Sequence, residues 1–322
     1  KVIIPEEIIA NTLNHPIHST ANAHPGRCSF PLEHYSPEKL TKLLEQAAKH
    51  RATQKANQLL TIQSIHGKDQ ALWIALAQTL GYRPNKLAMS LLAQRLPIHF
   101  LHQHTQLTAP LLFGAAGFLH PDIHKNAPAD SQQWLRELWD TWWQHRTNHE
   151  LTAERAIPWS LAGIRPVNHP QRRLAALSQI AKHWPTFTKL STQPKALTDW
   201  LTTLTDPFWS HHYTLTSKRS EKPLALIGKD RIRDLLTNHL LPLQITSENT
   251  HAWQSYLALP APSINEKVDK AAIRLLGQRP DKSTFLKKAY QHQAFLQIYQ
   301  DFCLQDTSDC ENCPFPEQLK SF

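Results

Sequence analysis

The positions of the four cysteines constrain the fold of this chain more than any other feature. Cys303, Cys310 and Cys313 form a C-x6-C-x2-C pattern near the C-terminus, and Cys28 lies near the other end. Four thiolates can bind tetrahedral zinc or a 4Fe–4S cluster. If one metal centre binds all four, the two ends of the fold must meet. Such a centre would be structural, because four thiolates leave no open position for a substrate.

The spacing leaves the metal undecided between a 4Fe–4S cluster and zinc, with the cluster favoured. C-x6-C-x2-C resembles the first three cluster ligands of helix-hairpin-helix DNA glycosylases, but residue 319 is Leu where their fourth cysteine would stand. Cys28 is the one thiol left to complete the set. The alternative is a group of free cysteines, or a reducible disulfide.

Composition predicts a mainly helical protein. The 322 residues are 41% hydrophobic and include 10 Trp, 23 Pro and 8 Gly, and scarce glycine argues against a fold with many tight β-turns. Without a visible linker or repeat, we expect one domain over 1–322 with about ten helices. It would have an irregular segment at 1–35 and a cysteine loop at 302–314. Few cysteines and no long apolar stretch favour a cytoplasmic protein that does not enter a membrane.

Local signals place several helix boundaries. Ser36 followed by Pro37 is typical of a helix start, and Gly67, Gly81 and Pro97 are typical breaks. The apolar stretch 109–119 predicts a buried helix. We expect a small β-hairpin from 209–216, where apolar and polar residues alternate, through a polar turn to 223–227.

Two basic stretches are candidates for anion binding. Each lies at a predicted helix start, where free N–H groups already favour anions and extra cations oppose the helix dipole. The alternative, weighed equally, is that these side chains form ion pairs inside the fold. The candidate residues are Arg165, His169, Arg172 and Arg173 in the first stretch, and Lys229, Arg231 and Arg233 in the second.

The net charge of +9 is consistent with a nucleic-acid partner, DNA rather than RNA. The sequence contains no complete catalytic motif. His120, His169 and the pair His211 and His212 would mark an active site only if a pocket with polar groups surrounded one of them.

Several stretches together resemble one bacterial family, domain of unknown function 2851. The stretches that carry the resemblance are 66–73, 80–82, 92–97, 112–117, 165–170, 228–232 and 303–314. Members of that family look longer, with an N-terminal β-rich half whose motifs are similar to the metal-binding acids of PD-(D/E)XK nucleases. Neither motif occurs in this sequence. The resemblance therefore implies a fragment that is the helical, non-catalytic half of a nuclease-like protein.

The sequence thus predicts a metal-stapled helical domain that binds nucleic acid. The alternative is a structural-zinc scaffold or protein-interaction domain with no nucleic-acid role.

Overall fold

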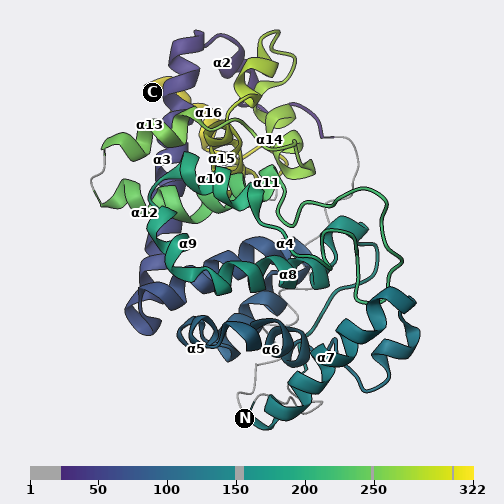
Figure 1. Cartoon of the computed structure of the whole chain (residues 1–322). Helices are drawn as coiled ribbons and strands as arrows, with labels where there is room; N and C mark the ends of the chain where they lie inside the picture. The colour runs from purple at the N-terminus through teal and green to yellow at the C-terminus, as the bar shows by residue number, and fades with distance from the viewer. Residues whose placement is uncertain (1–22, 149–155, 248–249, 307) are drawn as a thin grey trace, which may run out of the picture. The chain divides into compact units, whose positions relative to one another are not determined.

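The computed structural model describes residues 23–148, 156–247, 250–306 and 308–322. These residues are mainly helical, as predicted (Figure 1). The helices are α2 (Ser29–Glu33), α3 (Pro37–His66), α4 (Lys68–Arg95), α5 (Ile98–Gln103), α6 (Thr108–Ala115), α7 (Ala129–His145), α8 (Pro170–Lys182), α9 (Trp184–Leu190), α10 (Pro194–Thr203), α11 (Lys229–Leu235), α12 (Leu241–Thr246), α13 (Thr250–Ala258), α14 (Glu266–Leu276), α15 (Ala289–Ile298) and α16 (Phe315–Ser321). Two π-helical turns, η6 (Leu236–Leu240) and η8 (Tyr299–Cys303), extend α11 and α15.

The chain divides into two compact units. Unit 1 contains 1–48, 264–287 and 291–322, and unit 2 contains 49–263 and 288–290. The chain passes between them inside α3, after Ser263 and near the start of α15. Whether the two units act as the single domain predicted from the sequence stays a prediction.

The predicted helix boundaries rest on the expected local chemistry. The Ser36 hydroxyl accepts a hydrogen bond from the Lys39 amide at 3.2 Å, so it caps α3. Gly67 separates α3 from α4 with a φ of 82°, which glycine adopts at little cost. Within α4, Tyr82 and Asn85 have non-helical backbone angles on either side of Pro84. The two helices predicted on either side of this point are therefore confirmed, and the label α4 covers both of them.

The core of unit 2 lies among α4, α6, α7 and α8. α8 packs against α4 and α6, and α6 packs against α7 (Figure 1). The stretch 109–119 is buried over most of its length, as predicted. Gly114 on α6 makes the close approach to α7 possible, because a Cβ there would stand 2.0 Å from the Trp142 ring.

The predicted β-hairpin is wrong. The described residues contain no β-strand, only an isolated bridge between Pro260 and Lys288. The chain between α10 and α11 runs through turns instead, as the long green trace in Figure 1 shows. One backbone hydrogen bond does join the expected strands, from Leu224 to Ser210, and a second links Ser220 in the expected turn to His211.

Arg172 explains why these two bonds do not extend into a ladder. Its guanidinium donates hydrogen bonds to the carbonyl oxygens of Trp209 and His212, at 2.7 and 2.5 Å. It also donates to those of Leu224 and Ala225, at 3.4 and 2.8 Å. Carbonyls that bind a guanidinium in this way are not paired across a sheet.

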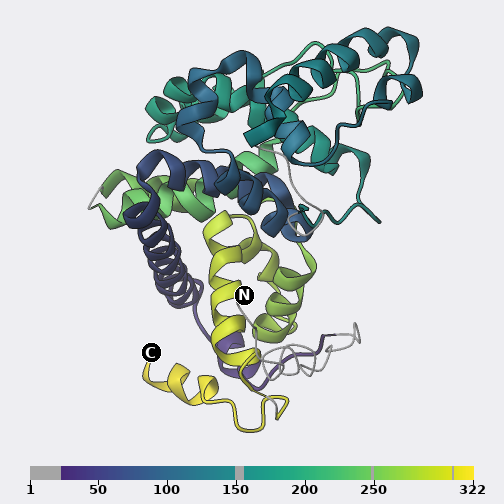
Figure 2. The ribbon, with the colours of Figure 1, turned by 90° about the horizontal axis from the view of Figure 1, so that it is seen from below.

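Unit 1 joins segments from both ends of the chain. The Gly26 amide donates to the Arg274 carbonyl at 2.8 Å, and the Tyr35 hydroxyl donates to the Leu319 carbonyl at 2.5 Å. Arg279 is 6% exposed and donates to the carbonyls of Leu32 and Tyr35. After η8 the chain forms the cysteine loop and then α16, the last yellow helix in Figure 2.

Candidate functional site

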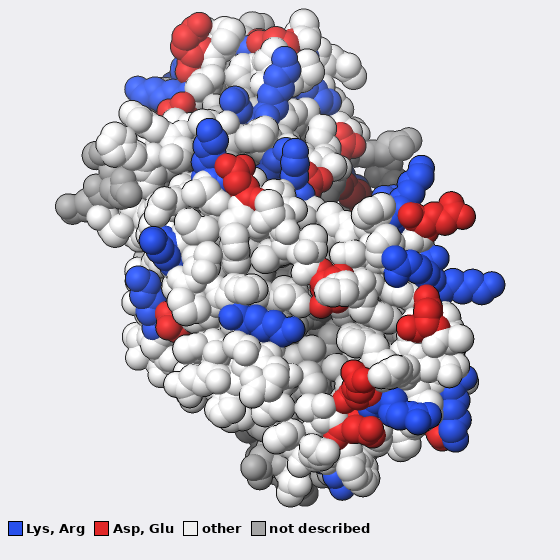
Figure 3. All heavy atoms as spheres, in the orientation of Figure 1, with Lys and Arg blue, Asp and Glu red and all other residues white. Residues whose placement is uncertain are grey.

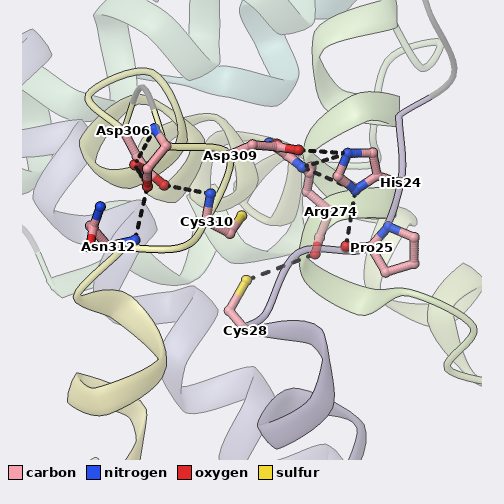
Figure 4. Close-up of polar contacts among 9 residues, drawn as sticks. His24, Pro25, Cys28, Arg274, Asp306, Asp309, Cys310 and Asn312 are labelled. Carbon is pink, nitrogen blue, oxygen red and sulfur yellow. Dashed lines mark hydrogen bonds and ion pairs between the residues drawn. The ribbon is translucent and has the colours of Figure 1, made fainter.

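The cysteine loop lies next to the segment that carries Cys28 in unit 1. A Cβ added to Gly26 would stand 3.2 Å from the Cys310 sulfur and 3.5 Å from the Cys28 sulfur. In Figure 4 both side chains lie close to Arg274. Cys28, Cys310 and Cys313 are buried and Cys303 is half-buried. The sequence prediction that the two ends of the fold meet here is consistent with these contacts.

A carboxylate and an ion pair hold the loop in its conformation. The Asp306 carboxylate accepts the backbone amides of Ser308 and Cys310 at 2.9 and 2.7 Å. Arg274 pairs with Asp309 at 2.6 Å, as Figure 4 shows. Asp309 and Cys310 have φ values of 52° and 80°, which cost energy in residues other than glycine. The surrounding hydrogen bonds offset that cost.

Burial and repulsion from neighbouring cysteines keep the thiols of Cys28 and Cys303 protonated. Burial, followed by the nearby Cys303, Cys310 and Cys313, raises the pKa of Cys28 to about 12. Burial also raises the pKa of Cys303 to about 12, and Arg274 partly opposes that change. Since the thiolate is the nucleophile, neither group is a reactive cysteine at neutral pH.

The expectation that a four-cysteine metal site joins the ends of the fold is wrong. Among the described residues, no group of three or more His, Cys, Asp or Glu is arranged to hold a metal ion. The Cys28 thiol instead donates a hydrogen bond to the Arg274 carbonyl oxygen, which lies 3.8 Å from the sulfur. Hydrogen bonds and the Arg274–Asp309 pair hold these segments together. That the protein carries a 4Fe–4S cluster or zinc stays a prediction.

The first basic stretch serves mainly the fold of unit 2. Arg172 is 1% exposed and donates only to backbone carbonyls. Arg173 is 6% exposed and donates to Asn168 at 2.6 Å and to the Leu226 carbonyl. His169 caps α8 by accepting the Gln171 amide at 3.3 Å. Arg165 alone among the four candidates is exposed.

The second basic stretch forms ion pairs along α11. Arg231 pairs with Asp234 at 2.7 Å, and Arg233 pairs with Asp230 at 2.6 Å. Lys229 is exposed. With 7 residues, α11 is too short to offer an anion site at its start, so the helix N-terminus alone does not account for anion binding here.

Tyr82 brings the two stretches together. The Arg231 guanidinium lies 3.5 Å from the centre of the Tyr82 ring, and the Arg173 guanidinium lies 5.6 Å from it. Both distances are within cation–π range. Tyr82 sits at the break of α4 with a φ of 57°, an uncommon and strained value for an aromatic residue.

Lys55 on α3 adds a cation that sequence reasoning missed. Its ammonium donates to the Asn238 side chain in η6. Burial, then the positive charges of Arg51 and Lys86, lowers its pKa to about 7, against the opposing effect of Asp234. Its place on a long helix carries no sequence signal. We refer to Lys55, Tyr82, Arg173, Arg231 and Asp234 as the Tyr82 cluster.

Positive charge dominates the surroundings of the Tyr82 cluster. Burial lowers the pKa of Arg173 to about 10, with Tyr82 opposing this change and neighbouring Arg231 contributing to it. Burial and then Lys55 and Lys86 lower the pKa of His239 to about 3, so this imidazole is neutral. Burial raises the pKa of Asp234. Neighbouring cations therefore contribute to the lowered pKa values of Lys55, Arg173 and His239.

Several buried polar atoms in and around the cluster have no hydrogen-bond partner within the described part of the chain. They are Arg173 Nε, Arg231 Nε, Thr237 Oγ1 and the Tyr256 hydroxyl. The last two residues lie on η6 and α13. π-Helical turns such as η6 are frequent at functional sites. Unpartnered donors beside excess positive charge are what an anion would satisfy.

The histidines considered as catalytic residues do not come together. His120 is exposed, and His211 and His212 bind the backbone carbonyls of Ser220 and Ser217. None of the three lines a cavity described for this chain. No helix within the described ranges is both long and apolar enough to cross a membrane.

Comparison with known proteins assigns a family and no activity. A family described as "Protein of unknown function (DUF2851)" matches residues 3–261, which include Cys28 and the whole Tyr82 cluster but not the three C-terminal cysteines. No curated protein and no solved structure matches the chain. Since the family match covers well over half of its length, the chain belongs to the DUF2851 family.

Proposed function

We propose that this protein binds nucleic acid and that cations around the Tyr82 cluster contact the phosphates. The observation that carries the proposal is the convergence of the two basic stretches on Tyr82, next to a lysine whose pKa is lowered to about 7. Excess positive charge at one place attracts phosphate. DNA is the expected polymer. The expected location is the cytoplasm, where thiols stay reduced, because all four cysteines are free.

Exposed cations supply the contacts themselves. Arg83 follows Tyr82, Lys86 lies one turn further along α4, and Lys229 begins α11. All three are exposed, whereas Arg172 and Arg173 are buried. The phosphate role thus moves from the buried arginines to the exposed residues of the same converging segments.

A local contact fits the surface better than a broad charged face. On the face drawn in Figure 3, Lys and Arg stand singly among Asp and Glu, with large uncharged areas between them. A protein that used this face for non-specific binding would need a continuous basic stripe. We therefore expect few phosphate contacts and a shallow salt dependence.

The test is the salt dependence of DNA binding, measured by anisotropy of a labelled duplex between about 50 and 200 mM salt, a range over which phosphate contacts weaken strongly. Arg83→Ala and Lys229→Ala should each reduce the slope of log K against log salt by about 0.9, since each removes one phosphate contact. Lys68→Ala removes an exposed cation from the other end of α4 and should leave the slope unchanged. Equal slopes for all variants would reject the phosphate role of the cluster.

The second candidate is a scaffold or protein-interaction domain, and one observation favours it. Arg172 and Arg173 bind carbonyl oxygens and an amide of their own chain, so they organise the fold. A protein that binds neither duplex DNA nor RNA at low salt would favour this candidate.

A further inference from the structure

Unit 2 contains a cavity that the Tyr82 cluster does not use. Its volume is about 210 Å³, and side chains of α6, α7 and α8 and of the chain after α10 line it. Sites for drug-sized ligands usually measure about 300–1,000 Å³. This cavity therefore has room for a single small molecule or ring system. We refer to it as the Trp134 cavity.

Aromatic rings form much of its wall. Phe113 and Trp209 stack with their ring centres 5.3 Å apart, and both are almost fully buried. Trp134 stacks on Phe208 at 3.9 Å and keeps part of its surface exposed. The partly exposed Trp134 ring favours a flat ligand, because bases stack on aromatic side chains.

A buried hydroxyl without a partner points to a polar ligand. Ser178 lines the cavity and is 2% exposed, and its hydroxyl has no hydrogen-bond partner among the described residues. A helical serine ordinarily bonds to a carbonyl of the preceding turn. A buried hydroxyl without a partner destabilises the protein, and a ligand atom that bonds to it removes that cost.

The charged residues at the cavity accept hydrogen bonds more than they donate them. Glu137 is exposed and uses Oε1 to accept the Gln133 amide at 3.0 Å. Asp206 accepts the Gln179 amide at 2.7 Å, and Lys182 is the one cation of the lining. Asp206 also accepts the backbone amides of Phe208 and Trp209, so both of its oxygens are engaged. The exposed Glu137 carboxylate is therefore the acceptor that a ligand can reach, and it suits a ligand that presents an N–H group.

We propose that the Trp134 cavity binds the amino-substituted ring of a nucleobase, such as adenine, guanine or cytosine. The ring lies against Trp134, its amino group donates to Glu137, and the Ser178 hydroxyl bonds a ring nitrogen or oxygen. The base comes either from a free nucleoside or from an unpaired position of a nucleic-acid strand. This inference does not depend on the phosphate contacts proposed above.

The experiment titrates the full chain with adenosine, cytidine and uridine, following tryptophan fluorescence and calorimetric heat. Uridine has a carbonyl where cytidine has an amino group, so it should bind at least tenfold more weakly. Glu137→Gln should remove most of that discrimination. Asp140→Asn changes the same charge on an exposed residue of α7 that does not line the cavity, and should retain it.

Ala109→Leu tests the cavity itself, because Ala109 lines it and is half-exposed, so the larger side chain enters the cavity without replacing a core residue. It should abolish nucleoside binding while the thermal unfolding temperature stays near that of the unchanged protein. If free nucleosides do not bind, a strand with an unpaired adenine should bind more tightly than a fully paired duplex, and Ala109→Leu should remove that difference. Equal binding of uridine and adenosine, or no effect of Ala109→Leu in either assay, would overturn the inference.

Discussion

Arg172 links two distant parts of unit 2 through one guanidinium group. Its carbonyl partners lie between Trp209 and Ala225, a stretch of the described chain without helix or strand. The arginine is 1% exposed and its bonds to Trp209 and His212 are buried, so those two carbonyls rely on it in place of water. One side chain thus determines the path of a long irregular segment.

Replacing Arg172 by Met should destabilise the protein by about 3 kcal/mol or more, because several buried carbonyls lose their donor together. Urea denaturation followed by circular dichroism measures the change. Arg165→Met, at an exposed position of the same stretch, should alter the free energy of unfolding by less than about 0.5 kcal/mol. A loss below about 1 kcal/mol for Arg172→Met would show that water replaces the guanidinium.

Lys55 should make stability depend on alkaline pH. Its pKa is about 7 in the folded chain and about 10.4 in the unfolded chain, so between these values only the unfolded chain keeps the proton. The free energy of unfolding therefore rises with pH from about 7 to 10. Below pH 7 both states are protonated and this contribution no longer changes.

The measurement compares urea denaturation of the unchanged protein and Lys55→Met at pH 7 and 9.5. Between these two pH values the free energy of unfolding should rise by about 1–3 kcal/mol more in the unchanged protein than in the variant. This is less than the full pKa shift implies, because Lys55 keeps some contact with water. Identical pH dependence in the two proteins would mean that Lys55 is charged and solvated in the folded state.

The pair formed by α6 and α7 depends on one glycine. A Cβ at Gly114 would overlap the Trp142 ring, and Trp142 is 5% exposed with little room to move. Gly114→Ala should therefore destabilise the protein by about 1–3 kcal/mol or more, although alanine favours helices. Gly228→Ala is the matched control, because its φ is −80° and no atom lies within 4 Å of the added carbon. Thermal unfolding of both variants checks the difference, and similar melting temperatures would contradict it.

Helix boundaries were predictable because they depend on neighbours in sequence. The cap at Ser36 and the break at Gly67 require only adjacent residues. The hairpin prediction failed because the buried residues of 209–216 are Trp209, His212 and Leu215, which do not alternate. The path of the chain there also depends on Arg172, far away in sequence. The role of an arginine likewise depends on the groups that the fold places beside it. Arg172 contacts backbone carbonyls, whereas Arg231 contacts the Tyr82 ring. Lys55 had no signal because lysine on a helix is ordinary.

At the scale of the whole molecule, the sequence predicted contact between the chain's ends but not its physical basis. The other three cysteines add to the effect of burial in raising the pKa of Cys28, as a shared location requires. Carbonyl acceptors and the Arg274–Asp309 pair, however, form the contacts seen in unit 1. Cysteines predict proximity because they are few and three of them form one pattern, whereas ion pairs between single charged residues leave no comparable pattern.

The interleaving of the two units affects the order in which the chain can fold during synthesis. Residues 49–263 of unit 2 are continuous, so nearly all of its contacts become available as soon as that stretch leaves the ribosome. The segment that carries Cys28 is translated before unit 2, yet its partners Arg274, Arg279 and Leu319 are made only after residues 49–263. Contacts this distant in sequence form slowly. A growing chain must therefore keep this segment without its partners while the whole of 49–263 is translated.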